Sequence, residues 1–201
     1  MTSPVQIREF GNQLSILMDD GTTAMCVPTS GGLWLCSPNT IGSGDIAWPF
    51  NKNLITSGYG PRTGGVGTFH EGVDFSGGAA VSGADVLCAA NGTVKMVATN
   101  SGFGNYVAVF HKTIDTFDFW TVYGHLATMS VAVNDAVVKG DKIGTLGNTG
   151  TVTGYVLHWE THKCSIGGSP IWNTTDDSNP RTAVDPVAFM STYGSSEVLN
   201  A

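Results

Sequence analysis

Two side chains with metal-binding chemistry lie four positions apart in the segment TFHEGVDFS, residues 68–76, where His70 and Asp74 flank Gly72. In a fully extended strand their backbones would be about 13 Å apart. To bind one ion, each side chain must bring an atom to about 2 Å from it, so the chain has to bend between them. We expect Gly72, which can adopt positive φ, to permit the bend. The segment alone leaves two interpretations open: part of a metal site, or polar residues where a loop enters a strand.

A third candidate ligand lies far along the chain in YVLHWETHKC, residues 155–164. The strand period of two places five side chains of this segment on one face: Val156, His158, Glu160, His162 and Cys164. A histidine among aliphatic and aromatic neighbours is poised to point into a cleft. His158 therefore joins His70 and Asp74 as a candidate ligand.

The elements that must position these residues are predicted to be short strands. The chain has 27 glycines in 201 residues and only 12% charged residues, and its short apolar runs are punctuated by Gly, Asn, Asp and Thr. No segment sustains a helical period for long, so the sequence predicts a mostly β, antiparallel protein with little helix. The length suits one catalytic domain with a small appendage.

Four divisions of the chain are expected. Residues 1–38 alternate apolar and polar positions between tight turns, which predicts a small β-rich N-terminal appendage without a deep core of its own. Residues 39–46 are rich in turn formers and are the predicted linker. Residues 47–190 form the predicted main domain, which ends in a short helical turn, and residues 191–201 are predicted to be a frayed tail.

Charge and hydropathy exclude two classes of partner. The formal net charge of −7 opposes binding to nucleic acid through phosphate neutralisation. No stretch reaches the roughly 18 apolar residues of a membrane span, so membrane insertion is not expected. The start, MTSPVQIREF, lacks the basic and apolar regions of a classical signal peptide.

The four cysteines lack the paired C-x-x-C spacing of a structural zinc site. Cys88, in ADVLCAANG, is expected to be a buried free thiol. Cys26 and Cys36 bracket a short apolar segment and could meet across a hairpin, so a disulfide between them is left open.

From Trp48 to about Phe189 the sequence resembles the lysostaphin-like (LytM-type) zinc metalloendopeptidases that cut bacterial peptidoglycan. The resemblance follows motifs in the same order along the chain: WPF, ITSGYGPR, FHEGVDFS, VLCAANGTVKMV, GFGNYVAVFH, TVYGHLATMSVAVNDAVVKGDKIGTLGNTGTVTG, LHWE and VDPVAFM. It implies a twisted antiparallel sheet with a metal groove walled by loops. It also implies that His70, Asp74 and His158 bind one Zn²⁺, with a water in the fourth position, and that His125, in YGHL, is a catalytic group beside the metal.

One position departs from the family pattern. The family usually has His-x-His where this chain has Val156 and His158. Valine can neither carry a proton nor hydrogen-bond an oxyanion, and loss of one such donor costs on the order of 10²–10³ in kcat in other hydrolases. Either the enzyme is slower and relies on His125 and zinc, or another residue fills the gap. His162 lies six residues beyond Val156, about 20 Å along an extended strand, so a bulge would be needed to bring it there.

Other polar residues have expected roles outside the metal shell. Glu160 shares the face of His158 and could orient another group as a partner of the ligands. Glu71 neighbours His70 on the opposite face of a strand, so we expect it to be exposed to solvent. His111 is expected to be a polar residue at a strand end rather than a ligand.

Aromatic and glycine-rich segments are less decisive. Tyr59, Tyr123 and Trp159 could line a peptide groove or pack in the core. The segment GNTGTVTG, residues 147–154, lacks the Lys-Ser/Thr ending of a nucleotide-binding loop and precedes a strand, so we reject a phosphate site there. The resemblance implies that it is a flexible wall of the cleft.

The expected function is zinc-dependent hydrolysis of a cross-bridge or stem peptide of peptidoglycan. The missing leader and the short chain suit a bacteriophage protein, either a lysin that stays in the host cytoplasm until holin-dependent release or a component of the virion tail. In the virion, residues 1–38 would dock onto tail proteins or oligomerise the enzyme. The alternative is a catalytically impaired module that keeps the fold and the zinc; Val156 favours this alternative, and the retained His70, Asp74, His158 and His125 oppose it.

Overall fold

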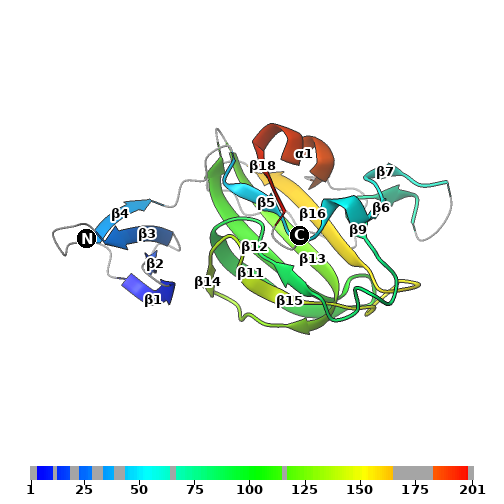
Figure 1. Cartoon of the computed structure of the whole chain (residues 1–201), viewed down its shortest axis with the longest axis horizontal. Helices are drawn as coiled ribbons and strands as arrows, with labels where there is room; N and C mark the ends of the chain where they lie inside the picture. Colours follow the sequence, from blue (N-terminus) through cyan, green and yellow to red (C-terminus); the bar gives the residue numbers. More distant parts are fainter. Residues whose placement is uncertain are drawn as a thin grey trace.

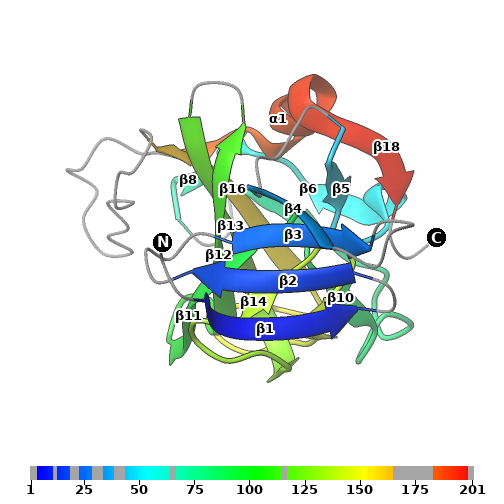
Figure 2. The same ribbon diagram turned by 90° about the vertical axis from the view of Figure 1, so that its left-hand side faces the viewer.

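The computed structural model describes residues 44–63, 67–114, 117–164 and 183–198, together with the backbone of four strands that precede them. These four strands form an antiparallel sheet in chain order, at one end of the molecule in Figure 1 and facing the viewer in Figure 2. They are β1 (Pro4–Phe10), β2 (Gln13–Met18), β3 (Thr23–Pro28) and β4 (Trp34–Pro38). Cys26 and Cys36 are directly opposite each other in the register of β3 and β4. The disulfide that the sequence leaves open between them depends on side chains that lie outside the described part of the chain.

A larger antiparallel sheet carries the rest of the fold. Its main path has the order β14-β11-β12-β13-β16-β9-β6, and three further strands lie off this path: β15 pairs with β13 and β10, and β17 pairs with β16. These strands are β6 (Ile55–Ser57), β9 (Val73–Phe75), β10 (Asp85–Leu87), β11 (Gly92–Asn100), β12 (Gly104–Ile114), β13 (Phe117–Met129), β14 (Ala136–Val137), β15 (Lys142–Leu146), β16 (Leu157–Cys164) and β17 (Ala183–Val184). The predicted antiparallel β fold is confirmed.

Smaller elements complete the described chain. A two-stranded hairpin of β7 (Gly60–Pro61) and β8 (Phe69–His70) lies beside the sheet, and the 3-10 helix η1 (Lys52–Leu54) precedes β6. In the described residues the one α-helix is α1 (Pro186–Tyr193), which agrees with the expected scarcity of helix. Asp185 caps it by accepting from the backbone N–H of Val187. Within the described ranges, no helix combines the length and apolarity needed to cross a bilayer.

The two ends of the main domain pair with each other. β5 (Ile46–Trp48) and β18 (Gly194–Val198) are parallel neighbours, and α1 lies directly before β18 (Figure 1). Ile46 and Ala47 are fully buried. The described structure thus includes Ile46, the last residue of the range predicted as linker, and β18, within the range predicted as tail. Each of these two strands acquires its partner only from the far end of the chain.

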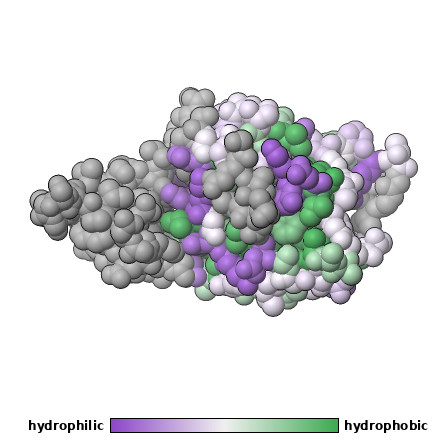
Figure 3. Space-filling model, viewed as in Figure 1, coloured by the Kyte–Doolittle hydropathy of each residue, from purple (hydrophilic) through white to green (hydrophobic). Residues whose placement is uncertain are grey.

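Aromatic side chains fill the core beneath the sheet. Tyr123 and Trp159 are completely buried, which decides in favour of core packing for both. Trp159 contacts Trp48, whose ring also meets Phe75 edge-on. Tyr59 is only half-buried, and its hydroxyl donates to the Ala183 carbonyl at 3.1 Å. On the face shown in Figure 3, hydrophobic and hydrophilic residues are interspersed over the larger domain.

His111, which was expected to be a polar residue at a strand end, belongs to this core. It is fully buried within β12 and stacks on Phe119. Its Nδ1 donates to the Asn91 carbonyl at 2.8 Å, and its Nε2 lies 2.7 Å from the Thr121 hydroxyl. Burial lowers the pKa of His111 to about 4. Cys88 is a buried free thiol, as predicted, and burial raises its pKa to about 12.

Candidate metal centre and active-site groove

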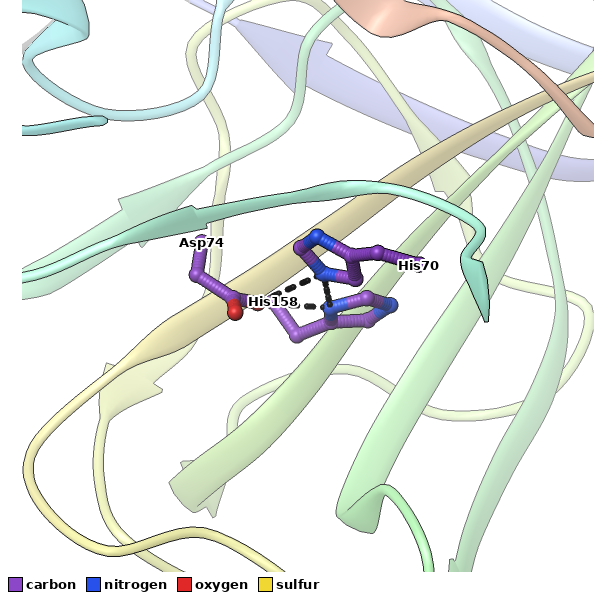
Figure 4. Close-up of side chains that lie close together, drawn as sticks. All are labelled: His70, Asp74 and His158. Carbon is purple, nitrogen blue, oxygen red and sulfur yellow. Dashed lines mark hydrogen bonds and ion pairs between the residues drawn. The ribbon is translucent and has the colours of Figure 1, made fainter. Parts of the chain in front are cut away.

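Three strands bring together the side chains that the sequence suggested as metal ligands. Asp74 on β9 is directly opposite His158 on β16, and side chains opposite each other on antiparallel strands share one face. His70 ends β8, which the hairpin with β7 holds over this face. One ligand atom from each of the three residues lies within 4.8 Å of the other two (Figure 4).

The ligand atoms converge closely. Asp74 Oδ1 is 3.1 Å from His70 Nε2 and 2.8 Å from His158 Nδ1. The two imidazole nitrogens are themselves 3.1 Å apart. The remaining polar atoms of these three side chains point away from the cluster.

Partners outside the cluster fix which atoms face inward. His70 Nδ1 lies 2.6 Å from the Gly58 carbonyl, which can only accept, so this nitrogen carries the proton. His158 Nε2 donates to Glu160 Oε1 at 2.9 Å, and Asp74 Oδ2 accepts from Arg62 Nη2 at 3.0 Å. With these outward bonds made, the inner nitrogens of the two imidazoles and the inner oxygen of Asp74 all face a single place. Two nitrogens and one oxygen in this arrangement fit a divalent cation, and zinc in particular.

The charges of the cluster agree with a cation site. Burial lowers the pKa of His158, but hydrogen bonds to Asp74 and Glu160 outweigh burial and raise the pKa to about 9. Burial raises the pKa of Asp74, yet the two histidines hold that pKa well below its usual range. Without a metal the cluster thus retains a proton on His158. A bound cation would displace that proton.

Gly72 lets β9 approach β16, but by a different means from the one predicted. It does not have the positive φ that we expected. Instead, a Cβ at this position would lie 2.4 Å from the Trp159 carbonyl and 3.0 Å from His158 Cε1. Gly72 is therefore required by close packing against the ligand strand rather than by a left-handed turn.

His125 lies beside the three ligands on β13. Its ring centroid is 5.9 Å from that of His158, and only 7% of the residue is exposed. Its φ of 61° is in the left-handed region, which non-glycine residues rarely adopt. Its backbone N–H donates to the Phe103 carbonyl at 2.7 Å, and its Nδ1 lies 2.8 Å from the Thr149 carbonyl. Burial lowers the pKa of His125, which favours the neutral imidazole that can accept a proton.

A groove of about 590 Å³ runs past these residues. Its lining includes the three candidate ligands and Thr151, Val152 and Thr153 of the segment 147–154 that was expected to wall the cleft. The full lining is Arg62, Phe69, His70, Glu71, Asp74, Asn100, Ser101, Gly102, Phe103, His125, Thr151, Val152, Thr153, Val156, His158 and Glu160. Val156 is half-buried in this lining. Glu71 is also half-buried there, whereas the strand period predicted a solvent-exposed side chain; the bend between β8 and β9 breaks that period.

Glu160 connects the cluster to a fourth histidine. Its carboxylate spans His158 on Oε1 and His162 Nε2 on Oε2, the latter at 2.7 Å. Burial raises the pKa of Glu160, but its bonds to both histidines outweigh burial and bring the pKa to about 2. The shared face predicted for His158, Glu160 and His162 is present. His162 is not among the residues that line the groove with Val156.

Sequence reasoning missed two contributors to the site. Arg62 belongs to the motif ITSGYGPR, so its place in the resemblance was a usable signal, although no role was assigned to it. Thr149 contributes a backbone carbonyl, and side-chain chemistry gives no signal for such a contact.

Comparisons with known proteins agree with this geometry. Residues 68–175 match the model of peptidase family M23. An uncharacterized metalloprotease of Haemophilus influenzae is 36% identical over 130 residues, which cover 61% of this chain and 26% of that protein. The peptidoglycan DD-endopeptidase ShyC of Vibrio cholerae is 34% identical over 117 residues, 56% of this chain and 25% of that protein. The chain thus spans about a quarter of the length of these relatives.

Solved structures show the same fold. The catalytic domain of the antimicrobial peptidase lysostaphin from Staphylococcus simulans is 29% identical with a TM-score of 0.53, over 70% of this chain and 95% of that one. A mutant catalytic domain of the prophage-encoded M23 protein EnpA from Enterococcus faecalis is 30% identical with a TM-score of 0.54, over 75% of this chain and 99% of that one. With the family model matching more than half of its residues around the His/Asp/His cluster, this chain belongs to peptidase family M23.

Proposed function

We propose that this protein is a zinc-dependent endopeptidase that hydrolyses peptide cross-bridges or stem peptides of bacterial peptidoglycan. One observation carries the proposal: the inward-facing atoms of His70, Asp74 and His158 lie within 4.8 Å of one another beside an open groove. The names of the relatives support the substrate class, since ShyC is a peptidoglycan endopeptidase.

The residues of the chain divide the chemistry among them. His70, Asp74 and His158 would hold Zn²⁺, which supplies Lewis acidity toward a scissile carbonyl and lowers the pKa of water. His125 carries its proton on Nδ1, which faces the Thr149 carbonyl, so Nε2 has a free lone pair. Nε2 then takes a proton from the attacking water. The same atom returns the proton to the leaving amine. Val156 contributes no donor to the developing oxyanion, so the reaction relies on His125 and the cation.

Zinc analysis combined with a cell-wall assay tests the proposal. We expect one zinc per chain, loss of turbidity when purified walls are digested, and arrest of this clearing by a chelator until zinc is restored. Digestion of walls of several chemotypes, followed by sequencing of the new amino termini, identifies the bond. Zinc bound tightly without cleavage of any wall would contradict the proposal and favour a catalytically impaired structural module, the alternative that Val156 supports.

We further propose that the protein acts for a bacteriophage, either as a lysin held in the host cytoplasm until holin-dependent release or as part of the virion tail. Similarity to a prophage-encoded M23 protein supports this setting. In the second case the sheet β1–β4 would attach the enzyme to tail proteins or to another copy of itself. Mass spectrometry of purified particles separates the two cases, because a lysin would be absent from them.

A further inference from the structure

The turn after β15 is fastened to the strand that carries His125. The hydroxyl of Thr149 donates to the Leu126 carbonyl at 2.9 Å and accepts from the backbone N–H of Asn105 at 3.0 Å. Leu126 directly follows His125 on β13, and Asn105 is its partner on β12. One side-chain oxygen therefore joins the turn to both central strands.

Two glycines allow the turn to sit directly on the neighbouring loop. Gly104 and Gly150 both have positive φ, 63° and 75°. A Cβ on Gly150 would lie 2.2 Å from Gly104 N, and one on Gly104 would lie 2.3 Å from the carbonyl carbon of Thr149. The backbones are in contact here, so the Thr149 carbonyl has little freedom to move. Thr149 and Gly150, in the predicted flexible wall, are therefore held by backbone contact and hydrogen bonds.

The Thr149 carbonyl in turn determines the protonation pattern of His125. It lies 2.8 Å from His125 Nδ1, and a carbonyl can only accept. A neutral imidazole has one N–H, so a proton on Nδ1 leaves the lone pair on Nε2. The Phe103 carbonyl also holds the backbone of the same histidine by accepting from its N–H at 2.7 Å.

We propose that Thr149 is a positioning residue: its hydroxyl holds its own carbonyl against His125 Nδ1, and this keeps His125 in the orientation and tautomer that present Nε2 as the proton acceptor. The inference rests on the proposed peptidase function. It adds that the turn after β15 sets the tautomer and orientation of the proposed base, His125. Thr149 itself is not among the residues that line the groove.

Two substitutions at one position separate positioning from bulk. Thr149→Val keeps the shape of the side chain and removes both hydrogen bonds, whereas Thr149→Ser keeps the hydroxyl. The matched control is Thr128→Val on β13, the strand that carries His125. It removes a hydroxyl that is hydrogen-bonded to Thr145 at 2.7 Å at an exposed position that does not line the groove. All variants are assayed as full-length, zinc-loaded protein for kcat, KM, zinc content and thermal midpoint.

A spectroscopic readout accompanies the kinetics. With ¹⁵N-labelled histidine, the imidazole nitrogen shifts at pH 8 report which nitrogen of His125 carries the proton, and His125→Ala identifies its signals. In the parent protein we expect the Nδ1–H form. In Thr149→Val we expect a mixture of both tautomers, a kcat lower by roughly 10- to 100-fold, and KM and zinc content within twofold of the parent. Thr149→Ser and Thr128→Val should stay within about twofold of the parent kcat.

The outcomes distinguish failure of this inference from failure of the proposed function. A parent protein with His125 protonated at Nε2 overturns the inference even if Thr149→Val does not fold. So does a Thr149→Val protein that loses kcat while His125 keeps its parental tautomer, because the effect is then structural. If the parent cleaves no cell wall, the proposed function fails, and the tautomer measurements still decide whether Thr149 holds His125.

Discussion

Asp74 and His158 face each other across the antiparallel strands β9 and β16, and Asp74 Oδ1 lies 2.8 Å from His158 Nδ1. Residues 84 positions apart thus meet as direct cross-strand neighbours. Backbone hydrogen bonds of the sheet set their spacing, so the pair does not depend on a mobile loop. Only His70, from the short hairpin strand β8, has to be brought in from outside this ladder. The relative position of Asp74 and His158 is therefore as stable as the sheet.

Replacing Val156 by histidine should raise activity. Val156 lines the groove beside His158, and a histidine there would add a donor for the oxyanion. We expect an increase in kcat of about tenfold or more, since one such donor is worth 10²–10³ in other hydrolases. Initial rates of wall clearing measure it, and Val156→Leu is the matched control without a donor. A Val156→His protein no faster than the parent would contradict the idea that the missing imidazole at position 156 lowers activity.

Removing the imidazole of His125 should abolish hydrolysis without removing the metal. His125 contacts neither Asp74 nor His70 through any of its hydrogen bonds within the described structure, and its Nδ1 is taken by Thr149. We expect His125→Ala to lower kcat by on the order of 10²–10⁴ and to keep one zinc per chain. Elemental analysis and the clearing assay are made on the same preparation. Loss of zinc together with activity would mean that His125 belongs to the metal shell.

Glu160 should tune metal affinity through His158. Its carboxylate accepts from His158 Nε2 at 2.9 Å and makes that imidazole a better ligand. Glu160→Gln keeps the size of the side chain and removes its charge, so zinc affinity should fall by about 10- to 100-fold. A titration against a chromophoric chelator measures this, with Asp85→Asn on the exposed Lys142 pair as control. Unchanged zinc affinity would show that the hydrogen bond to Glu160 does not strengthen His158 as a ligand.

A methyl group at Gly72 should disrupt the site. The Cβ of Gly72→Ala would lie 2.4 Å from the Trp159 carbonyl, which belongs to the backbone of β16 and cannot move aside cheaply. We expect a destabilisation of about 1–3 kcal/mol and weaker zinc binding. Chemical denaturation of the variant provides the stability, and Gly154→Ala, whose Cβ would meet no atom within 4 Å, is the control. Equal stability of the two variants would mean that β9 and β16 can separate without cost.

His111 should make the fold sensitive to acid. Its pKa falls from 6.5 to about 4 because burial disfavours the charged form. Between pH 6.5 and 4 the folded state therefore binds fewer protons at His111 than the unfolded state does. The stability that neutral His111 contributes is fully present above pH 6.5 and is lost as the pH falls toward 4. The shift corresponds to about 3 kcal/mol at most. Denaturation curves between pH 7 and 4 should show this slope, and His111→Gln should flatten it; an unchanged slope would assign the acid sensitivity to other groups.

The sequence by itself determined the mostly β architecture and the identity of the clustered residues. Alternating runs punctuated by glycine favour short strands, and the motif order around His70, Asp74, His125 and His158 marked the family. The strand period correctly placed Glu160 beside His158, because a period of two is a local property of the backbone.

Only the tertiary structure decided what depends on neighbours distant in sequence. Gly72 is needed for its missing Cβ rather than for its φ, and this is visible only once β16 lies against it. His111 is buried because β12 lies between β11 and β13 and its ring stacks on Phe119, although its local sequence resembles a strand end. The carbonyl of Thr149 has no side-chain signature, and its contact with His125 exists because two glycine backbones meet. Local patterns fix which chemistry is present, whereas long-range packing fixes which atom of each group is free to react.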